Sequence, residues 1–286
     1  MRPRALFASS LMSPLMALGC GVERSGTNDG EGDTLTNPDG EVAEVSEVID
    51  DYAAPSCEGR PDGEPLTPGR WASRQRSAAI VNLPPTNTPT TVVTTRLILH
   101  DVARVDGETR LTHTTCQLRQ PKLNGVEVVF GPAFLGAVPK NTVVAALDGD
   151  EVTIPPDLVV LGAEVGDGEA LPTTAEDPRI RDTDSDGQPG VTVTLQGLLA
   201  GQLFVVYRQE VGLTGTADRA GCVAGLVAGA SEQIQIGASP IELEQIDLSP
   251  RPHPDASLST FALVPVAAEL DCAGLIAQDL ELFGPE

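Results

Sequence analysis

Three aspartates alternate with single residues near the middle of the chain, at Asp182, Asp184 and Asp186, and Gly187 follows them. Carboxylates at positions 1, 3 and 5 of a short loop converge on one centre, and a glycine at position 6 permits the sharp turn that brings them together. Gln188 would add its backbone carbonyl at position 7. Because a hard cation prefers oxygen ligands in this arrangement, the spacing predicts a Ca²⁺-binding loop.

The segment from Asp182 to Gly190 resembles the calcium loops of EF-hand proteins, dockerins and thrombospondin type 3 repeats. An EF-hand loop also needs a bidentate Glu at position 12, and this chain has Val193 there, inside a strand-like run. We therefore reject an EF-hand and expect a missing ligand from elsewhere, with Glu176 and Asp177 as candidates. Three carboxylates this close repel one another without a counter-cation. The alternative is an Asp-rich turn that holds no ion.

A second candidate metal site involves two of the three histidines. An Asp-Gly dipeptide at positions 106–107 separates the strand-like runs 97–105 and 108–116, and it is typical of a two-residue hairpin turn. That turn places His100 opposite His113, with Cβ atoms about 4.5–5.5 Å apart. Two imidazoles at this separation could share Zn²⁺ or Cu²⁺. The alternative is that both histidines pack in the core beside apolar neighbours.

Sequence signatures of common enzymes are missing. The chain has no G-x-S-x-G, no H-E-x-x-H, no phosphate-binding G-x-x-x-x-G-K-[ST] and no G-x-G-x-x-G after a strand. The third histidine, His253, lies between two prolines in a stiff loop that suits structure better than catalysis. We expect a non-catalytic protein, with a metal-handling protein or hydrolase using His100 and His113 as one alternative.

The elements that would position these residues read as β-strands. Asn-Gly and Asp-Gly turns between strand-like runs predict an antiparallel meander. We expect an all-β domain whose meander forms a barrel, with a β-sandwich as the alternative, and a short helix over residues 273–282. The strand-like runs are 97–105, 108–116, 126–130, 142–147, 151–154, 191–195, 203–207, 210–216, 233–236 and 259–266.

The tripeptide Gly69-Arg70-Trp71 resembles the G-x-W motif that opens the first strand of lipocalins, a family of ligand-binding barrels. In that family the tryptophan packs across one end of the barrel. The resemblance covers three residues, and the other lipocalin signatures are not recognisable. It implies a carrier of a small apolar ligand, whereas the alternative is a tryptophan that closes the core.

Four cysteines follow Cys20 in the chain, and in an exported protein an even number predicts two disulfides. No two of them have the C-x-x-C spacing of a metal site. Four cysteines allow three pairings. We favour Cys57–Cys116 with Cys222–Cys272, because each pair then joins one half of the chain.

The N-terminal residues indicate export. Two arginines, an apolar run from Ala5 to Leu18 and a glycine precede Cys20. This resembles a bacterial lipoprotein signal with its lipobox, in which Cys20 becomes the lipidated first residue, although Ala17 stands where Leu is usual. An ordinary secretory signal is the alternative. We expect a signal peptide over residues 1–19, a lipidated cysteine and disordered acidic tether over 20–56, and a single β-domain over 57–286.

The negative charge of the chain limits the kinds of partner that it can bind. It has 41 acidic and 18 basic residues, so phosphate backbones are repelled and nucleic-acid binding is not expected. Gly21 stands where Asp would resemble an inner-membrane retention signal, which favours the outer membrane. We therefore expect a lipid-anchored protein of the bacterial cell envelope, whose disulfide-stapled, calcium-stabilised β-domain binds a protein or small apolar ligand or serves envelope architecture.

Overall fold

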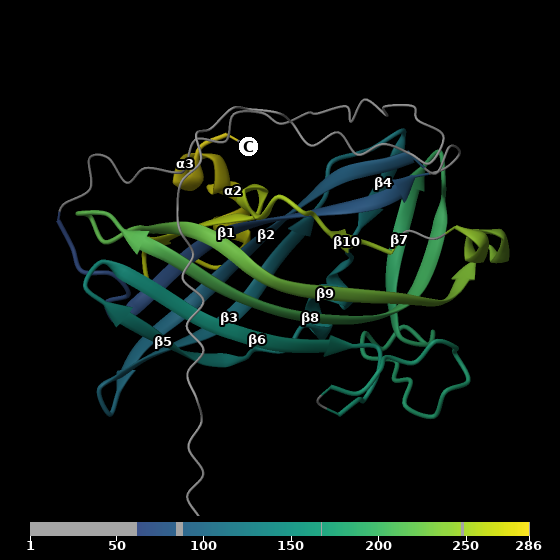
Figure 1. Cartoon of the computed structure of the whole chain (residues 1–286), viewed down its shortest axis with the longest axis horizontal. Coiled ribbons are helices and arrows are strands. Elements are labelled where there is room, and N and C mark those ends of the chain that lie inside the picture. The colour runs from purple at the N-terminus through teal and green to yellow at the C-terminus, as the bar shows by residue number, and fades with distance from the viewer. Residues whose placement is uncertain (1–61, 84–87, 167, 247–248, 286) are drawn as a thin grey trace, which may run out of the picture. The chain divides into compact units, whose positions relative to one another are not determined.

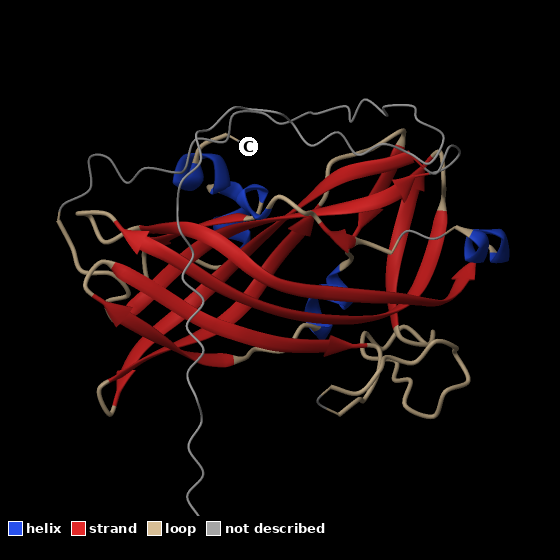
Figure 2. Cartoon of the chain, viewed as in Figure 1, coloured by secondary structure: helices blue, strands red, loops and turns tan. Residues whose placement is uncertain are grey.

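The computed structural model describes residues 62–83, 88–166, 168–246 and 249–285, all within one compact unit. The predicted signal peptide, Cys20, the tether and Cys57 lie outside the described residues. Most of the described chain forms one antiparallel sheet of eleven strands (Figures 1 and 2). The strands are β1 (Gly69–Leu83), β2 (Thr88–Val105), β3 (Glu108–Arg119), β4 (Val126–Val129), β5 (Thr142–Asp148), β6 (Glu151–Leu161), β7 (Val191–Gly197), β8 (Gly201–Ala217), β9 (Val223–Ser239), β10 (Arg251–Pro252) and β11 (Thr260–Pro265).

Eight of these strands close into a ring through antiparallel pairs, in the order β1–β2–β3–β5–β6–β8–β9–β11 and back to β1. The predicted class, an antiparallel all-β domain with a short helical segment near the C-terminal end, is confirmed. The helical elements of the described chain are α1 (Pro132–Ala137), α2 (Cys272–Ala277), α3 (Asp279–Phe283) and the 3-10 turns η1 (Ile241–Gln245) and η2 (Ala256–Leu258).

Turn chemistry sets the register of the meander. Asp106 and Gly107 have φ angles of 54° and 85°, and Asn124 and Gly125 have φ angles of 49° and 78°. Positive φ at both central residues is the requirement of the type I′ hairpin turn, whose twist matches that of the flanking strands. The predicted pairing across the first of these turns is therefore confirmed, with His100 opposite His113.

Two strands of the ring change partners along their length. Residues 109–112 of β3 pair with β5, whereas Arg119 pairs with β4. Residues 201–205 of β8 pair with β7, whereas residues 207–216 pair with β6. Toward one end of the ring, β4 is thus the partner of β3 in place of β5, and β7 is the partner of β8 in place of β6. The loop that joins β6 to β7 contains the predicted calcium motif.

An apolar cluster fills one end of the ring interior. Each of the eight ring strands contributes at least one buried side chain to it, including Trp71 from β1 and Leu213 from β8. Trp71 is 1% exposed, and its indole Nε1 donates a hydrogen bond to the Thr67 carbonyl at 2.9 Å. A second apolar cluster, which includes Phe134 and Val205, fills the other end. The two clusters leave a less densely filled space between them.

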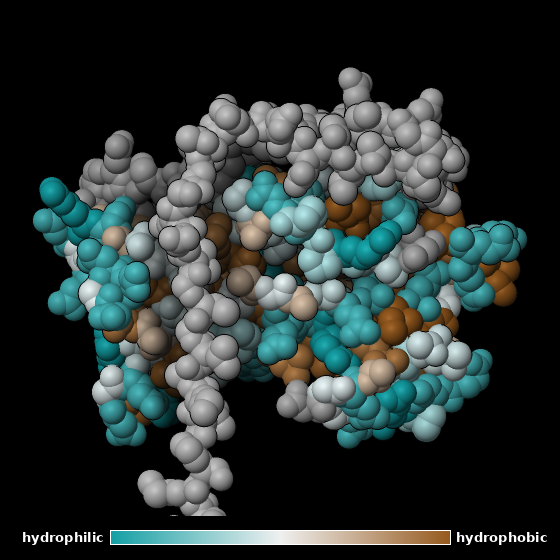
Figure 3. Space-filling model, in the orientation of Figure 1, coloured by the Kyte–Doolittle hydropathy of each residue, from teal (hydrophilic) through white to brown (hydrophobic). Residues whose placement is uncertain are grey.

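The helices α2 and α3 lie against the outer face of β1, β2 and β11, opposite to Trp71 (Figure 1). Leu275 and Phe283 pack there on Ala72 and Leu97. This covering explains why successive residues of β1 are buried although they point to opposite faces. On the face shown in Figure 3, hydrophilic residues gather at both ends of the long axis and apolar residues are visible between them.

The disulfide pairing corrects the sequence-based expectation. Cys116 on β3 bonds to Cys272 at the start of α2, with Cα atoms 5.0 Å apart, so Cys57–Cys116 and Cys222–Cys272 are wrong. Cys222 is also disulfide-bonded. The expectation assumed that each half of the chain folds on itself. In the structure, residues 270–285 instead return to the first three strands.

Candidate functional site

The predicted calcium loop lies at the base of the long connection between β6 and β7. Gly162 and Gly190 flank this connection with φ angles of 81° and 86°, a region that favours glycine. A Cβ atom would lie 2.6 Å from the Val205 carbonyl oxygen of β8 if placed on Gly162, and 2.5 Å from it if placed on Gly190. Both ends of the connection therefore pack closely against the backbone of β8. The backbone of Thr183 donates to the Gly190 carbonyl at 3.2 Å and closes the loop.

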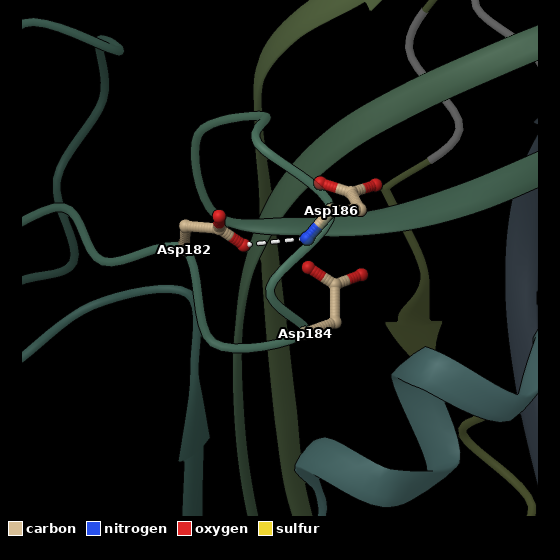
Figure 4. A group of neighbouring side chains, drawn as sticks. All are labelled: Asp182, Asp184 and Asp186. Atoms are coloured by element: carbon tan, nitrogen blue, oxygen red, sulfur yellow. Dashed lines mark hydrogen bonds between the residues drawn. The ribbon is translucent and has the colours of Figure 1, made fainter.

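The carboxylates of Asp182, Asp184 and Asp186 converge as predicted. One oxygen from each lies within 4.8 Å of the others, a separation at which the three could hold a metal ion. Figure 4 shows the three side chains around one turn of the loop, with the Asp182 carboxylate reaching the Asp186 backbone nitrogen at 3.2 Å. Asp184 accepts a hydrogen bond from the Thr192 backbone nitrogen at 2.9 Å. The start of β7 therefore fixes the central carboxylate.

The electrostatics of the loop also suit a cation. Burial raises the pKa of Asp184, and the charges of Asp186 and Asp182 raise it further. The Oδ1 atom of Asp184 is buried and has no hydrogen-bond donor among the described residues. A bound cation would reverse the effect on this pKa, since an opposite charge favours the ionised carboxylate.

The two residues proposed as additional ligands are not part of this carboxylate cluster. Asp177 forms an ion pair with Arg179 at 2.7 Å, and that contact lowers the pKa of Asp177 to about 2. Glu176 also lies outside the group of three that the described residues form. The Gln188 backbone nitrogen donates to Asp186 at 2.8 Å, so Gln188 shapes the loop through its N–H group.

The histidine pair is a buried, neutral arrangement. The ring centroids of His100 and His113 lie 4.8 Å apart with planes inclined by 80°. His100 Nε2 shares a hydrogen bond of 2.7 Å with the Ser73 hydroxyl. Burial lowers the pKa of His100 well below its usual value, and burial lowers that of His113 to about 4. No third His, Cys, Asp or Glu of the described residues joins them in a metal-binding group.

A cavity of about 350 Å³ lies in the ring interior between the two apolar clusters. Its wall comes mainly from β1, β2, β8 and β9, with residues 250–259 along one side. One part of the wall is apolar, with Phe130, Phe134, Val205, Val211 and Val227. Small-molecule sites in proteins have volumes of about 300–1,000 Å³, so the cavity lies at the lower end of that range.

The polar part of the wall is built around Arg96. Its Nε and Nη2 atoms donate to the Thr115 hydroxyl at 3.2 Å and 2.7 Å, and its Nη1 atom donates to the Gln209 side-chain oxygen at 3.1 Å. Arg96 is surrounded by protein on most sides. The rest of its surface is accessible because it borders the cavity. Tyr207 lines the same cavity, and burial raises the pKa of its phenol to about 12.

Arg96 and Tyr207 were not predicted from the sequence as functional residues. The sequence does contain an indication of both residues. Arg96 directly precedes the apolar run Leu97-Ile98-Leu99, and Tyr207 directly follows Val205-Val206. Charged side chains are almost never fully buried unless they are paired, so a charged residue inside a strand of high apolar content marks a site worth testing.

Comparisons of the chain with protein-family models, with curated proteins and with solved structures found no match. Within the described residues, no helix is both long enough and apolar enough to cross a membrane.

Proposed function

We propose that this protein is a non-catalytic, small-molecule-binding protein that holds its ligand inside the ring of strands. The observation that carries the proposal is the cavity of about 350 Å³. A cavity of this size is far larger than the share of one water molecule in the liquid, about 30 Å³. Close packing is the rule in protein interiors, so a space of this size supports binding over a purely architectural role.

The proposal combines two expectations from the sequence: a lipid-anchored protein of the cell envelope and a carrier of a small apolar ligand. The domain would be presented from the outer membrane of a bacterial cell by lipid on Cys20 and an acidic tether, and it would take up a small ligand with an apolar body. The apolar side chains Phe130, Phe134 and Val211 support the second part, since apolar contacts supply most of the affinity in such pockets. Metal handling by His100 and His113 lacks a third ligand among the described residues.

We further propose that Ca²⁺ occupies the carboxylate cluster and stabilises the connection between β6 and β7. Three converging carboxylates and the unpaired Oδ1 atom of Asp184 support this assignment. The carbonyl of Gln188 and water would complete the coordination, because Ca²⁺ takes six to eight oxygen ligands. The ion would act on stability, since the loop rests on the β8 backbone at Val205.

Ligand binding is tested with phenylnaphthylamine, a neutral probe that fluoresces in apolar surroundings. We expect saturable enhancement of its fluorescence with the full chain. The Val211→Phe variant places a larger side chain in the cavity wall and should weaken binding about tenfold or more. Val144→Phe makes the same change at a position that is 42% exposed and serves as the matched control. Absence of saturable binding, or equal loss in both variants, would contradict the proposal.

A further inference from the structure

The wall of the cavity differs in charge from the rest of the molecule. The chain has 41 acidic residues and a formal net charge of −23. No Asp or Glu, however, is among the described residues that line the cavity, and Arg96 is the one permanently charged side chain among them. Among the described lining residues, a ligand in the cavity therefore meets one permanent positive charge and no carboxylate.

The Arg96 guanidinium has hydrogen-bonding capacity to spare. A guanidinium carries five N–H donors. Three hydrogen bonds go to Thr115 and Gln209, both neutral. Two donors, one on Nη1 and one on Nη2, have no acceptor among the described residues. Two donors from one planar group match the two oxygens of a carboxylate.

Asp157, the carboxylate whose charge influences Arg96, is already hydrogen-bonded to another residue. The charge of Asp157 opposes the lowering of the Arg96 pKa by burial, but no ion pair within 4.0 Å joins the two among the described residues. Asn141 Nδ2 instead donates to both oxygens of Asp157, at 2.9 Å and 3.0 Å. A buried charge without an opposite charge in contact is unfavourable, so an anionic ligand that contacts Arg96 would be stabilised there.

Tyr207 supplies a further donor on the same side of the cavity. Its phenol is close enough to Arg96 that the positive charge opposes the rise in the Tyr207 pKa, which still reaches about 12. The hydroxyl is thus protonated at neutral pH and can donate. It makes no hydrogen bond within the described part of the chain, although Tyr207 lines the cavity.

We infer that the ligand of this protein is a monocarboxylate with an apolar body, whose carboxylate binds Arg96 and Tyr207 inside the ring. The inference rests on the proposed small-molecule function and assigns the chemical class of the ligand. One cation favours a monoanion over a phosphate dianion. The apolar body fits the part of the wall formed by Phe130, Phe134 and Val205, whose side chains have no polar atoms.

Competition against phenylnaphthylamine tests the inference, with decanoate, decanol and decylamine as competitors of equal chain length. We expect decanoate to displace the probe at a concentration about tenfold or more below that of decanol, as a charge-assisted pair of hydrogen bonds implies. Decylamine should be the weakest competitor. Arg96→Met should abolish the preference for decanoate, while Tyr207→Phe should reduce the preference in part.

The outcomes separate the inference from the function on which it rests. If the probe does not bind the wild-type protein, the proposed function fails. If the probe binds but decanol or decylamine competes as well as decanoate, the function stands and the carboxylate assignment is overturned. The comparison of head groups in the wild-type protein is decisive even where Arg96→Met does not fold. A decanoate preference that survives in folded Arg96→Met would also overturn the role of Arg96.

Discussion

His100 and His113 face each other across β2 and β3 with their ring centroids 4.8 Å apart, and both are held neutral inside the ring. Each imidazole has a buried nitrogen without a hydrogen-bond partner among the described residues, Nδ1 of His100 and Nε2 of His113. Protonation of either ring would place a charge in the interior beside Arg96, which itself lowers both pKa values. The pair therefore makes the fold sensitive to acid.

We predict that acid destabilises the protein through this pair. A base whose pKa is lower in the folded state binds more protons when unfolded, so the free energy of unfolding falls as the pH falls below 6.5. For His113, whose pKa is about 4 in the folded protein, the loss reaches roughly 3 kcal/mol at pH 4. Urea unfolding from pH 7 to pH 4 measures it. His113→Gln should flatten the curve, whereas the control His253→Gln should not.

Calcium should raise the melting temperature, and a chelator should lower it. At a calcium concentration ten times the Kd, the stabilisation is about 1.4 kcal/mol. Asp184→Asn removes the central carboxylate and should abolish the response. Asp148→Asn, at the end of β5, is the matched control and should keep it. An unchanged melting temperature of the wild-type protein at millimolar calcium would refute calcium binding.

The buried ion pair between Arg74 and Asp279 should contribute more to stability than the exposed pair between Arg70 and Asp101. Arg74 is 0% and Asp279 5% exposed, whereas the Asp101 side chain is 60% exposed. Asp279→Asn should lower the free energy of unfolding by about 3 kcal/mol, because it removes the charge of a buried carboxylate that forms ion pairs with both Arg74 and Arg119. Asp101→Asn should change it by less than about 1 kcal/mol. Denaturant unfolding of both variants gives the comparison, and equal effects would contradict it.

The disulfide between Cys116 and Cys272 should hold α2 and α3 on the sheet. It closes a separation of 156 positions, so its removal in Cys116→Ala/Cys272→Ala should cost about 2–5 kcal/mol. Peptide mapping under non-reducing conditions should recover one peptide pair containing both residues. Amide exchange should then show loss of protection at residues 272–283 in the double variant, with protection in β5 and β6 unaffected. A Cys222–Cys272 peptide would refute the assignment.

Local rules allowed the sequence to predict the hairpins but not the contacts between segments that are far apart in the chain. Asp106-Gly107 determines its own turn, and period-two geometry then places His100 opposite His113. The pairing of Cys116 with Cys272 instead depends on helices that return from the other end of the chain, and no nearby residue encodes that return. Sequence proximity is a poor guide to such contacts, and it led to the wrong pairing.

The candidate sites show the same division. The Asp182–Asp186 motif is local, so its convergence could be predicted, whereas its neighbours in space could not, and Asp177 is bound to Arg179. The cavity is formed mainly by two pairs of consecutive strands, β1 with β2 and β8 with β9, and the two pairs meet only in the folded ring. Arg96 and Tyr207 are 111 positions apart in number and become one site through the sheet alone.

The contacts of Arg74 govern when the molecule can become native. Its guanidinium donates to the carbonyls of Phe283 and Gly284, at 2.7 Å and 2.8 Å, and the second contact spans 210 positions. During synthesis β1 emerges long before these acceptors exist, so these two hydrogen bonds cannot form in a nascent chain. These two contacts of β1 can therefore form only when almost the whole domain has been made. A prematurely terminated chain would lack the two carbonyl acceptors of Arg74 and the helices that cover β1, and would become a substrate for proteolysis.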